Sequence, residues 1–149
     1  MKYSANVVDI LLVEDNPGDV RLTEEALKES KIAVNMRVAS DGIMALAMLH
    51  REGEYADQPT PDLILLDLNM PRMDGREVLR QIKSDEQLKH IPVVILTTSE
   101  AEKDIVQAYG LHANCYITKP VELDEFIEIV KSIEGFWLTV VKLPDGLGR

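Results

Sequence analysis

The stretch that decides the fold is LILLDLNMP, residues 63–71, in which four apolar residues lead directly into Asp67. A continuous apolar run of this length is typical of a strand that is buried on both faces. The proline that ends the stretch indicates that the chain turns soon after the carboxylate. We therefore interpret this segment as a buried strand that holds one carboxylate rigidly at its end.

On either side, short apolar segments alternate with segments of helical periodicity. The expected strands are residues 7–13, 34–39, 62–67, 91–97 and 114–118. The expected helices are residues 16–30, 41–53, 74–85, 99–110 and 121–133. Asn16 and Ser99 are expected N-caps, and Gly53 and Gly110 are expected to close their helices. This alternation predicts an α/β fold, with a doubly wound five-stranded parallel sheet and five helices on its two faces.

Composition limits the classes of function. The chain has 149 residues, enough for one domain with a full core, and its 16 Lys and Arg against 26 Asp and Glu give a net charge of −10. That charge disfavours nucleic acids and anionic membranes as partners. Cys115 is the only cysteine, which excludes an internal disulfide and fits a reducing compartment. Because no apolar run is long enough for a bilayer and no signal-peptide pattern begins the chain, we expect a cytoplasmic protein.

Polar residues follow the expected strands at the edge where doubly wound sheets bind their ligands. These residues are Glu14 and Asp15, Asp67, Thr97 and Thr98, and Lys119 and Pro120. Clustered carboxylates repel one another, and a hard cation such as Mg²⁺ relieves that repulsion. Lys119, the Thr97 hydroxyl and the Thr98 backbone N–H suit a tetrahedral anion. The set therefore predicts a magnesium-assisted site in which Asp67 attacks phosphorus and forms an aspartyl phosphate.

Four motifs occur in order along the chain: VED at 13–15, LLDLNMPRMDG at 65–75, ILTTS at 95–99 and YITKP at 116–120. Together they resemble the receiver domain of two-component response regulators, over about residues 8–133. The resemblance implies a flavodoxin-like receiver fold with strand order 2-1-3-4-5. It also implies that a sensor histidine kinase donates a phosphoryl group, and that the phosphorylated protein switches its interactions with a downstream protein target.

The same resemblance implies roles for the residues of the site. Asp67 is the expected phospho-acceptor, and Lys119 the amine that senses the phosphoryl group. Glu14, Asp15 and Asp67, with the backbone carbonyl of Asn69, are the expected Mg²⁺ site. Within it, Asp15 would bind the ion directly and Glu14 mainly through water.

Signal readout is assigned to residues beside the site. By the resemblance, Thr97 is the switch hydroxyl, Tyr116 is the switch aromatic residue, and the peptide bond before Pro120 is cis. In an unrelated protein, Tyr116 on a short strand would more often be a core residue. Cys115 is expected to be a small buried strand residue.

A narrower resemblance rests on the long segment 51–61, on residues 88–99 and 112–120, and on GFWLTVVKLP at 135–144. These segments look like the small response regulators that are paired with bacterial phytochromes, which are single receivers without an output domain. This resemblance implies a phytochrome as the phosphodonor. We accordingly expect a receiver domain over 1–134 and a tail over 135–149.

Two other functions use a similar sheet. A phosphohydrolase with an aspartyl nucleophile needs a second acid two residues after that nucleophile, and this position is Asn69, which cannot protonate a leaving group. A flavodoxin-like cofactor protein is disfavoured because the flavin phosphate would meet three carboxylates. We therefore favour a switch over an enzyme.

The tail carries apolar residues that a five-stranded receiver does not need, among them Phe136, Trp137 and Leu138. Leaving this cluster in water would be costly. We expect it to form a homodimer together with the last helix. The alternative is that the tail folds back on its own domain.

Overall fold

The computed structural model describes residues 7–29, 33–68, 70, 73–97, 115–119, 122, 124, 125 and 128. Its strands are β1 (Val8–Val13), β2 (Val34–Ala39), β3 (Leu63–Asp67), β4 (Val93–Thr97) and β5 (Cys115–Thr118). Its helices are α1 (Pro17–Glu29), α2 (Gly42–Leu49), α3 (Gly75–Ser84) and a short 3₁₀ helix, η2 (Gly53–Tyr55). None of these helices is long and apolar enough to cross a membrane.

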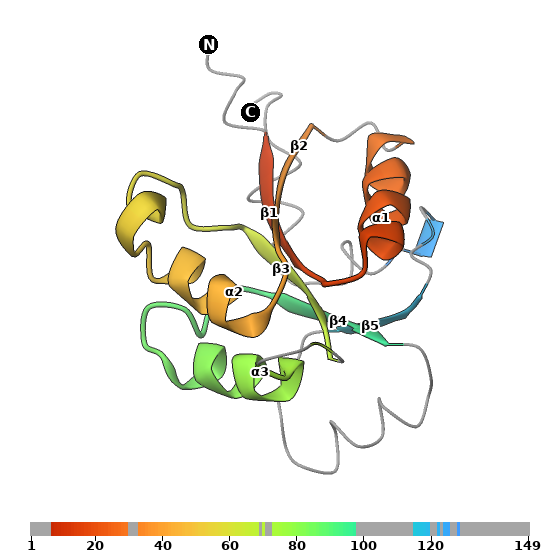
Figure 1. Cartoon of the computed structure of the whole chain (residues 1–149). Coiled ribbons are helices and arrows are strands. Elements are labelled where there is room, and N and C mark those ends of the chain that lie inside the picture. The colour runs from red at the N-terminus through yellow and green to blue at the C-terminus, as the bar shows by residue number, and fades with distance from the viewer. Residues whose placement is uncertain are drawn as a thin grey trace.

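The five strands form one parallel sheet in the order β2-β1-β3-β4-β5, which confirms the predicted topology (Figure 1). The strand of the opening stretch, β3, is central, with β1 on one side and β4 on the other. Every residue of β3 is buried, as the continuous apolar run predicted.

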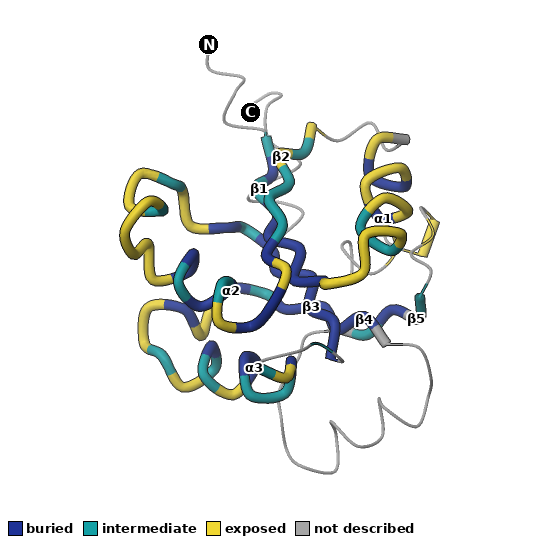
Figure 2. The backbone as a smooth tube through the Cα atoms, viewed as in Figure 1, coloured by how far each residue is buried: buried dark blue, intermediate teal, exposed yellow. Residues whose placement is uncertain are grey.

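Helices cover both faces of the sheet: α1 lies on one face, and α2 and α3 lie on the other (Figure 1). Successive side chains of a strand point to opposite faces, so each strand contributes to two cores. Leu11, Ile64 and Ile95 pack with residues of α2 and α3. Ile10 and Leu65 pack instead with the buried residues of α1. Figure 2 shows the resulting distribution: the central strand β3 is buried, the edge strand β2 is mostly half-buried, and exposed residues lie on the outer sides of the helices.

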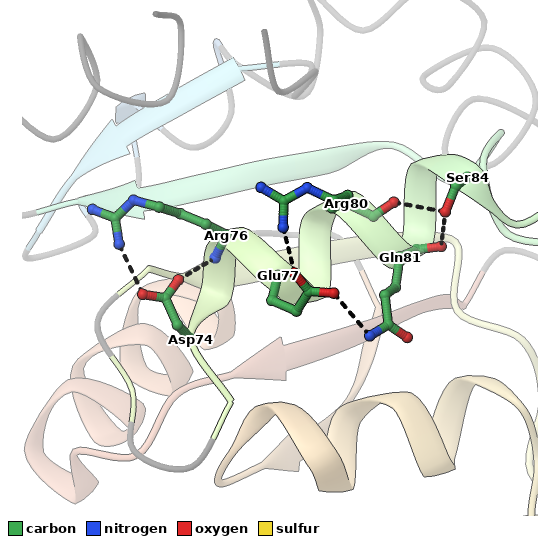
Figure 3. Close-up of polar contacts among 6 residues, drawn as sticks. All are labelled: Asp74, Arg76, Glu77, Arg80, Gln81 and Ser84. Carbon is green, nitrogen blue, oxygen red and sulfur yellow. Dashed lines mark hydrogen bonds and ion pairs between the residues drawn. The ribbon is translucent and has the colours of Figure 1, made fainter. Parts of the chain in front are cut away.

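The helix starts follow the capping signals of the sequence. The Asn16 side chain accepts a hydrogen bond from the backbone N–H of Asp19 at 3.1 Å, as expected for the N-cap of α1. Asp74 caps α3 and accepts from the backbone N–H of Arg76 at 2.6 Å. The outer face of α3 carries side-chain contacts between residues of neighbouring turns, including Arg80 with Glu77 (Figure 3).

The prediction that the second helix continues to Gly53 is wrong. α2 ends at Leu49, because Arg51 adopts a left-handed conformation with φ 57°. The N–H of Arg51 donates to the carbonyl of Met48, and the N–H of Glu52 donates to that of Ala47, at 3.1 and 3.0 Å. This is a Schellman motif, and an arginine occupies the position where glycine is usual.

A residue of β2 holds the segment between α2 and β3 in place. The Arg37 guanidinium donates to the side-chain carbonyl of Gln58 at 2.5 Å and to the backbone carbonyl of Pro59 at 2.8 Å. The segment therefore returns along the sheet to the amino end of β3.

Two predicted helices fall largely beyond this description. Residues 99–110 lie outside the described residues, as does the tail 135–149. Of residues 121–133, four are described, and Asp124, Glu125 and Glu128 among them are helical.

Candidate functional site

Three carboxylates meet at the carboxyl edge of the sheet, where β1 and β3 end side by side. Asp67 is the last residue of β3 and is 3% exposed. Glu14 and Asp15 directly follow β1, and Glu14 is buried whereas Asp15 is exposed. One carboxylate oxygen from each of these residues lies within 4.8 Å of the others. Crowded carboxylate oxygens with one exposed member suit a divalent cation that keeps part of its water.

Lys119 crosses this edge from the end of β5. Its Nζ donates to Glu14 Oε1 at 3.0 Å and to Asp19 Oδ2 at 2.9 Å. Asp67 Oδ1 lies farther away, at 3.5 Å from the same nitrogen. The parallel strand order produces this arrangement, because residues 105 positions apart in the chain end at one edge.

The environment shifts the acidity of these groups. Burial, together with the charge of Asp67, raises the pKa of Glu14 to about 7, while the hydrogen bond from Lys119 acts in the opposite direction. For Lys119, burial favours the neutral amine, but the hydrogen bonds to Asp19 and Glu14 and the charge of Asp67 prevail and raise its pKa. Lys119 is therefore a permanent positive charge among carboxylates that repel one another.

Gly75 places the turn that follows Asp67. Its N–H donates to the carbonyl of Leu68 at 3.0 Å, which folds the chain back onto the end of β3. A Cβ at position 75 would lie 2.3 Å from the Asp67 carbonyl oxygen and 2.7 Å from Leu68 Cα. The start of α2 packs similarly, since a Cβ on Gly42 would lie 2.6 Å from the Met73 carbonyl oxygen. The loop between β3 and α3 thus fits because two positions have no side chain.

Four of the predicted site residues are brought together in the described structure: Glu14, Asp15, Asp67 and Lys119. Thr97 ends β4, where its backbone pairs with Thr118, and its hydroxyl lies outside the described atoms. Asn69, Thr98 and Pro120 also lie outside the described residues.

The expected switch residue Tyr116 is half-buried on β5, opposite Ile95. Its ring packs against the core on the side of α2 and α3, and burial raises the pKa of its hydroxyl. Its position is consistent with both readings of the sequence, as a core residue and as a switch.

Sequence reasoning missed Asp19. This residue lies in the first turn of α1 and pairs with Lys119. The signal was an acidic residue one helical turn after Asp15, in a helix that begins at the edge of the site. Its partner is 100 positions away, so no local pattern could identify the pair.

A model of the response regulator receiver domain matches residues 10–131. The chain belongs to this family. It is a response regulator receiver of the two-component type, with a phospho-accepting role in signalling. The four sequence motifs predicted this family correctly, and the strand order that the resemblance implied is the one observed.

Several receivers are similar over most of their length. Response regulator Rcp1 of Synechocystis sp. is 52% identical over 135 residues, which cover 91% of this chain and 92% of Rcp1. The phosphorylated cyanobacterial phytochrome response regulator RcpA superposes with a TM-score of 0.73 at 55% identity, covering 92% of this chain and 98% of RcpA. The bacteriophytochrome response regulator AtBRR superposes with a TM-score of 0.83 at 44% identity, covering 88% of this chain and 95% of AtBRR.

A metal-bound relative bears on the carboxylate cluster. A structure of Rcp1 is a Mn²⁺-bound form, with a TM-score of 0.72 at 51% identity, covering 92% of this chain and 99% of that one. The three carboxylates described here have the oxygen ligands and the close spacing that such a cation needs.

Proposed function

We propose that Asp67 is the phospho-acceptor of this receiver. The observation that carries the proposal is the position of its carboxylate, which lies at the end of the central strand, 3.5 Å from the Lys119 ammonium. A nucleophile in this place is held by strands on both sides, and a neighbouring cation can stabilise the charge of the incoming group.

In the proposed transfer, an Asp67 oxygen attacks phosphorus and forms a P–O bond. The bond to the donor breaks, either P–N of a phosphohistidine or P–O of an acyl phosphate, and the leaving group takes its electron pair. Lys119 then donates a hydrogen bond to a phosphoryl oxygen, as do the Thr97 hydroxyl and the Thr98 N–H. Asp15, Asp67 and the Asn69 carbonyl would hold Mg²⁺, with Glu14 acting through water. The ion would supply positive charge among the carboxylates.

Signal readout follows from the same chemistry. We infer that the Thr97 hydroxyl moves toward the phosphoryl group and that Tyr116 fills the space it leaves. We also infer that the peptide bond between Lys119 and Pro120 is cis. Tyr116 is half-buried and packs against the core on the side of α2 and α3, and we infer that its ring moves inward on phosphorylation.

The proposed phosphodonor is a sensor histidine kinase, and specifically a phytochrome. Support comes from RcpA and AtBRR, which are phytochrome response regulators with 55% and 44% identity to this chain. We place the protein in the cytoplasm and assign residues 1–134 to the receiver and 135–149 to a tail. The phosphorylated receiver would bind a downstream protein target.

The protein is proposed to be a switch and not an enzyme that turns over a substrate. Asn69 stands where a phosphohydrolase would need its second acid, and an amide cannot protonate a leaving group. Repeated hydrolysis of a small phosphoester by the wild-type protein would support the alternative, an aspartyl phosphohydrolase.

Intact-protein mass spectrometry tests the proposal. The wild-type protein, incubated with acetyl phosphate and Mg²⁺, should gain one phosphoryl group, and Asp67→Asn should gain none. Asp57→Asn is the matched control, because Asp57 is exposed in the segment between α2 and β3 and should leave the uptake unchanged. Uptake by Asp67→Asn at the wild-type level would show that the acceptor is another residue.

A further inference from the structure

Lys119 is engaged by residues other than the proposed acceptor. Its Nζ makes hydrogen bonds to Asp19 at 2.9 Å and to Glu14 at 3.0 Å, while Asp67 is at 3.5 Å. An ammonium has three donors, and two of them are used on the side of β1 and α1. In this position the short hydrogen bonds of Lys119 both go to carboxylates other than that of Asp67.

The backbone of Asp19 is held in place at the start of its helix. The backbone N–H of Asp19 donates to the Asn16 side chain at 3.1 Å, and the Thr23 hydroxyl donates to the Asp19 carbonyl at 2.9 Å. Because Asp19 lies in the first turn of α1, the positive end of the helix dipole also favours its negative charge. The partner of Lys119 on this side is thus an acidic side chain on a well-fixed backbone.

The two partners of Lys119 differ in their access to water. The Glu14 side chain is 1% exposed, whereas that of Asp19 is 28% exposed. A buried carboxylate that loses its cation is left unsolvated, but a partly exposed one is hydrated again. When a phosphoryl group with about two negative charges arrives, the contact with Asp19 should break first.

We propose that Asp19 is a positioning residue that holds Lys119 toward α1 and thereby slows the phosphorylation of Asp67. This inference rests on the proposed function and adds a determinant of its rate. Asp19 competes with the phosphoryl group for the same ammonium, so the strength of the Asp19–Lys119 pair sets part of the cost of phosphorylation. Asp19 itself touches neither the phosphoryl group nor the proposed Mg²⁺ ligands in this scheme.

The kinetic test compares three variants of the full chain with wild type, using acetyl phosphate and Mg²⁺. Asp19→Asn keeps the size of the side chain and removes its charge, and it should raise the rate of phosphorylation roughly two- to fivefold. Asp19→Glu restores the charge and should return the rate toward wild type. Glu25→Gln makes the same change of charge at an exposed position of α1, and should leave the rate unchanged.

A second measurement follows Lys119 in the protein without metal or phosphodonor. The NMR signal of its Nζ, assigned by its loss in Lys119→Gln, should shift in Asp19→Asn and remain in place in Glu25→Gln. A merely structural role for Asp19 would alter the melting temperature without this specific shift.

The outcomes separate the two proposals. An unchanged or slower rate in Asp19→Asn, or an unshifted Lys119 signal, overturns the role of Asp19 while phosphorylation of Asp67 stands. If the wild-type protein takes up no phosphoryl group at Asp67, the proposed function is wrong. The proposal that Asp19 slows this phosphorylation is then wrong too, even when the Lys119 signal shifts as expected.

Discussion

At the scale of single residues, the site depends on a close backbone contact that only a residue without a side chain permits. Gly75 lies so close to the end of β3 that a Cβ there would be 2.3 Å from the carbonyl oxygen of Asp67. No rotamer relieves a clash with backbone atoms, so a larger residue must move the loop or the end of the strand.

Gly75→Ala should therefore cost about 3 kcal/mol of the free energy of unfolding, and should lower phosphoryl uptake from acetyl phosphate because Asp67 is displaced. Urea denaturation and mass spectrometry measure the two effects. Gly53→Ala is the control, since Gly53 has φ 52° with nothing within 4 Å of a Cβ. It should cost about 1–2 kcal/mol for the left-handed conformation alone, with uptake unchanged. Equal losses in both variants would show that the approach to Asp67 has no special cost.

Asp62, which lies far from the site, allows a prediction of how stability depends on pH. Burial raises the pKa of this carboxyl, the hydrogen bond from the Asp9 N–H opposes that effect, and the charge of Asp9 adds to it. A raised pKa in the folded state means that the native protein binds more protons than the unfolded chain between the two pKa values. The contribution of Asp62 to stability therefore falls as pH rises through that window.

Asp62→Asn retains an acceptor for the Asp9 N–H, which is 2.9 Å from Asp62 Oδ2, and removes the charge. We expect a higher melting temperature than wild type at pH 7, by an amount equivalent to about 0.5 kcal/mol. The gain should shrink as pH falls toward 4, because Asp62 becomes protonated in the folded state, where its pKa is raised, before it does so in the unfolded chain. A gain that is constant across this range in thermal melts would contradict the electrostatic explanation.

At the scale of elements, the strands were the most predictable part of the chain. A strand buried on both faces needs apolar residues at every position, and this pattern placed β3 within one residue of its observed start. Alternation of apolar and polar residues placed the edge strand β2 at Val34–Ala39. The end of α2 was missed because its left-handed residue is Arg51, and only glycine would have signalled it. Sequence patterns show local preference, and here the backbone of Arg51 adopts a conformation that this preference does not favour.

Some residues of the candidate site could be predicted from the sequence, and others could not. Glu14, Asp15, Asp67 and Lys119 were predictable because each follows a recognisable strand. Asp19 and Gly75 were not, because their importance depends on what the folded chain brings against them.

The loop after Asp67 leads into α3, so its position depends on how α3 packs against the sheet. Leu79 is fully buried between α3 and the sheet, and Leu79→Ala should cost about 2–5 kcal/mol of the free energy of unfolding. Leu22→Ala makes the same chemical change on α1 at a side chain that is 50% exposed, and should cost less than about 0.5 kcal/mol. Chemical denaturation of both variants measures the difference, and similar midpoints would contradict the assignment of α3 to the core.

At the scale of the whole molecule, the proposed homodimer can be tested with the full chain. Each chain carries a net charge of −10, so two copies repel each other at low ionic strength. If the contact is apolar and formed by residues 121–133 and 135–149, light scattering should show the dimer fraction rising with salt. A chain ending at Ile133 should remain folded and monomeric. A folded truncation with the same mass distribution as the full chain would refute a tail-built dimer.

The segment between α2 and β3 has a consequence for how such proteins diversify. It joins β3 at Leu63, four residues before Asp67, and a strand rises about 3.3 Å per residue, so the segment and the carboxylate belong to opposite edges of the sheet. Its anchor, Arg37, reaches the segment from β2, away from the carboxylates. We therefore expect that changes in the length or sequence of this segment leave the carboxylates in place, as is usual for surface loops remote from a site. For the same reason it is a suitable position to insert a peptide tag or attach a fluorophore while the protein continues to accept phosphate.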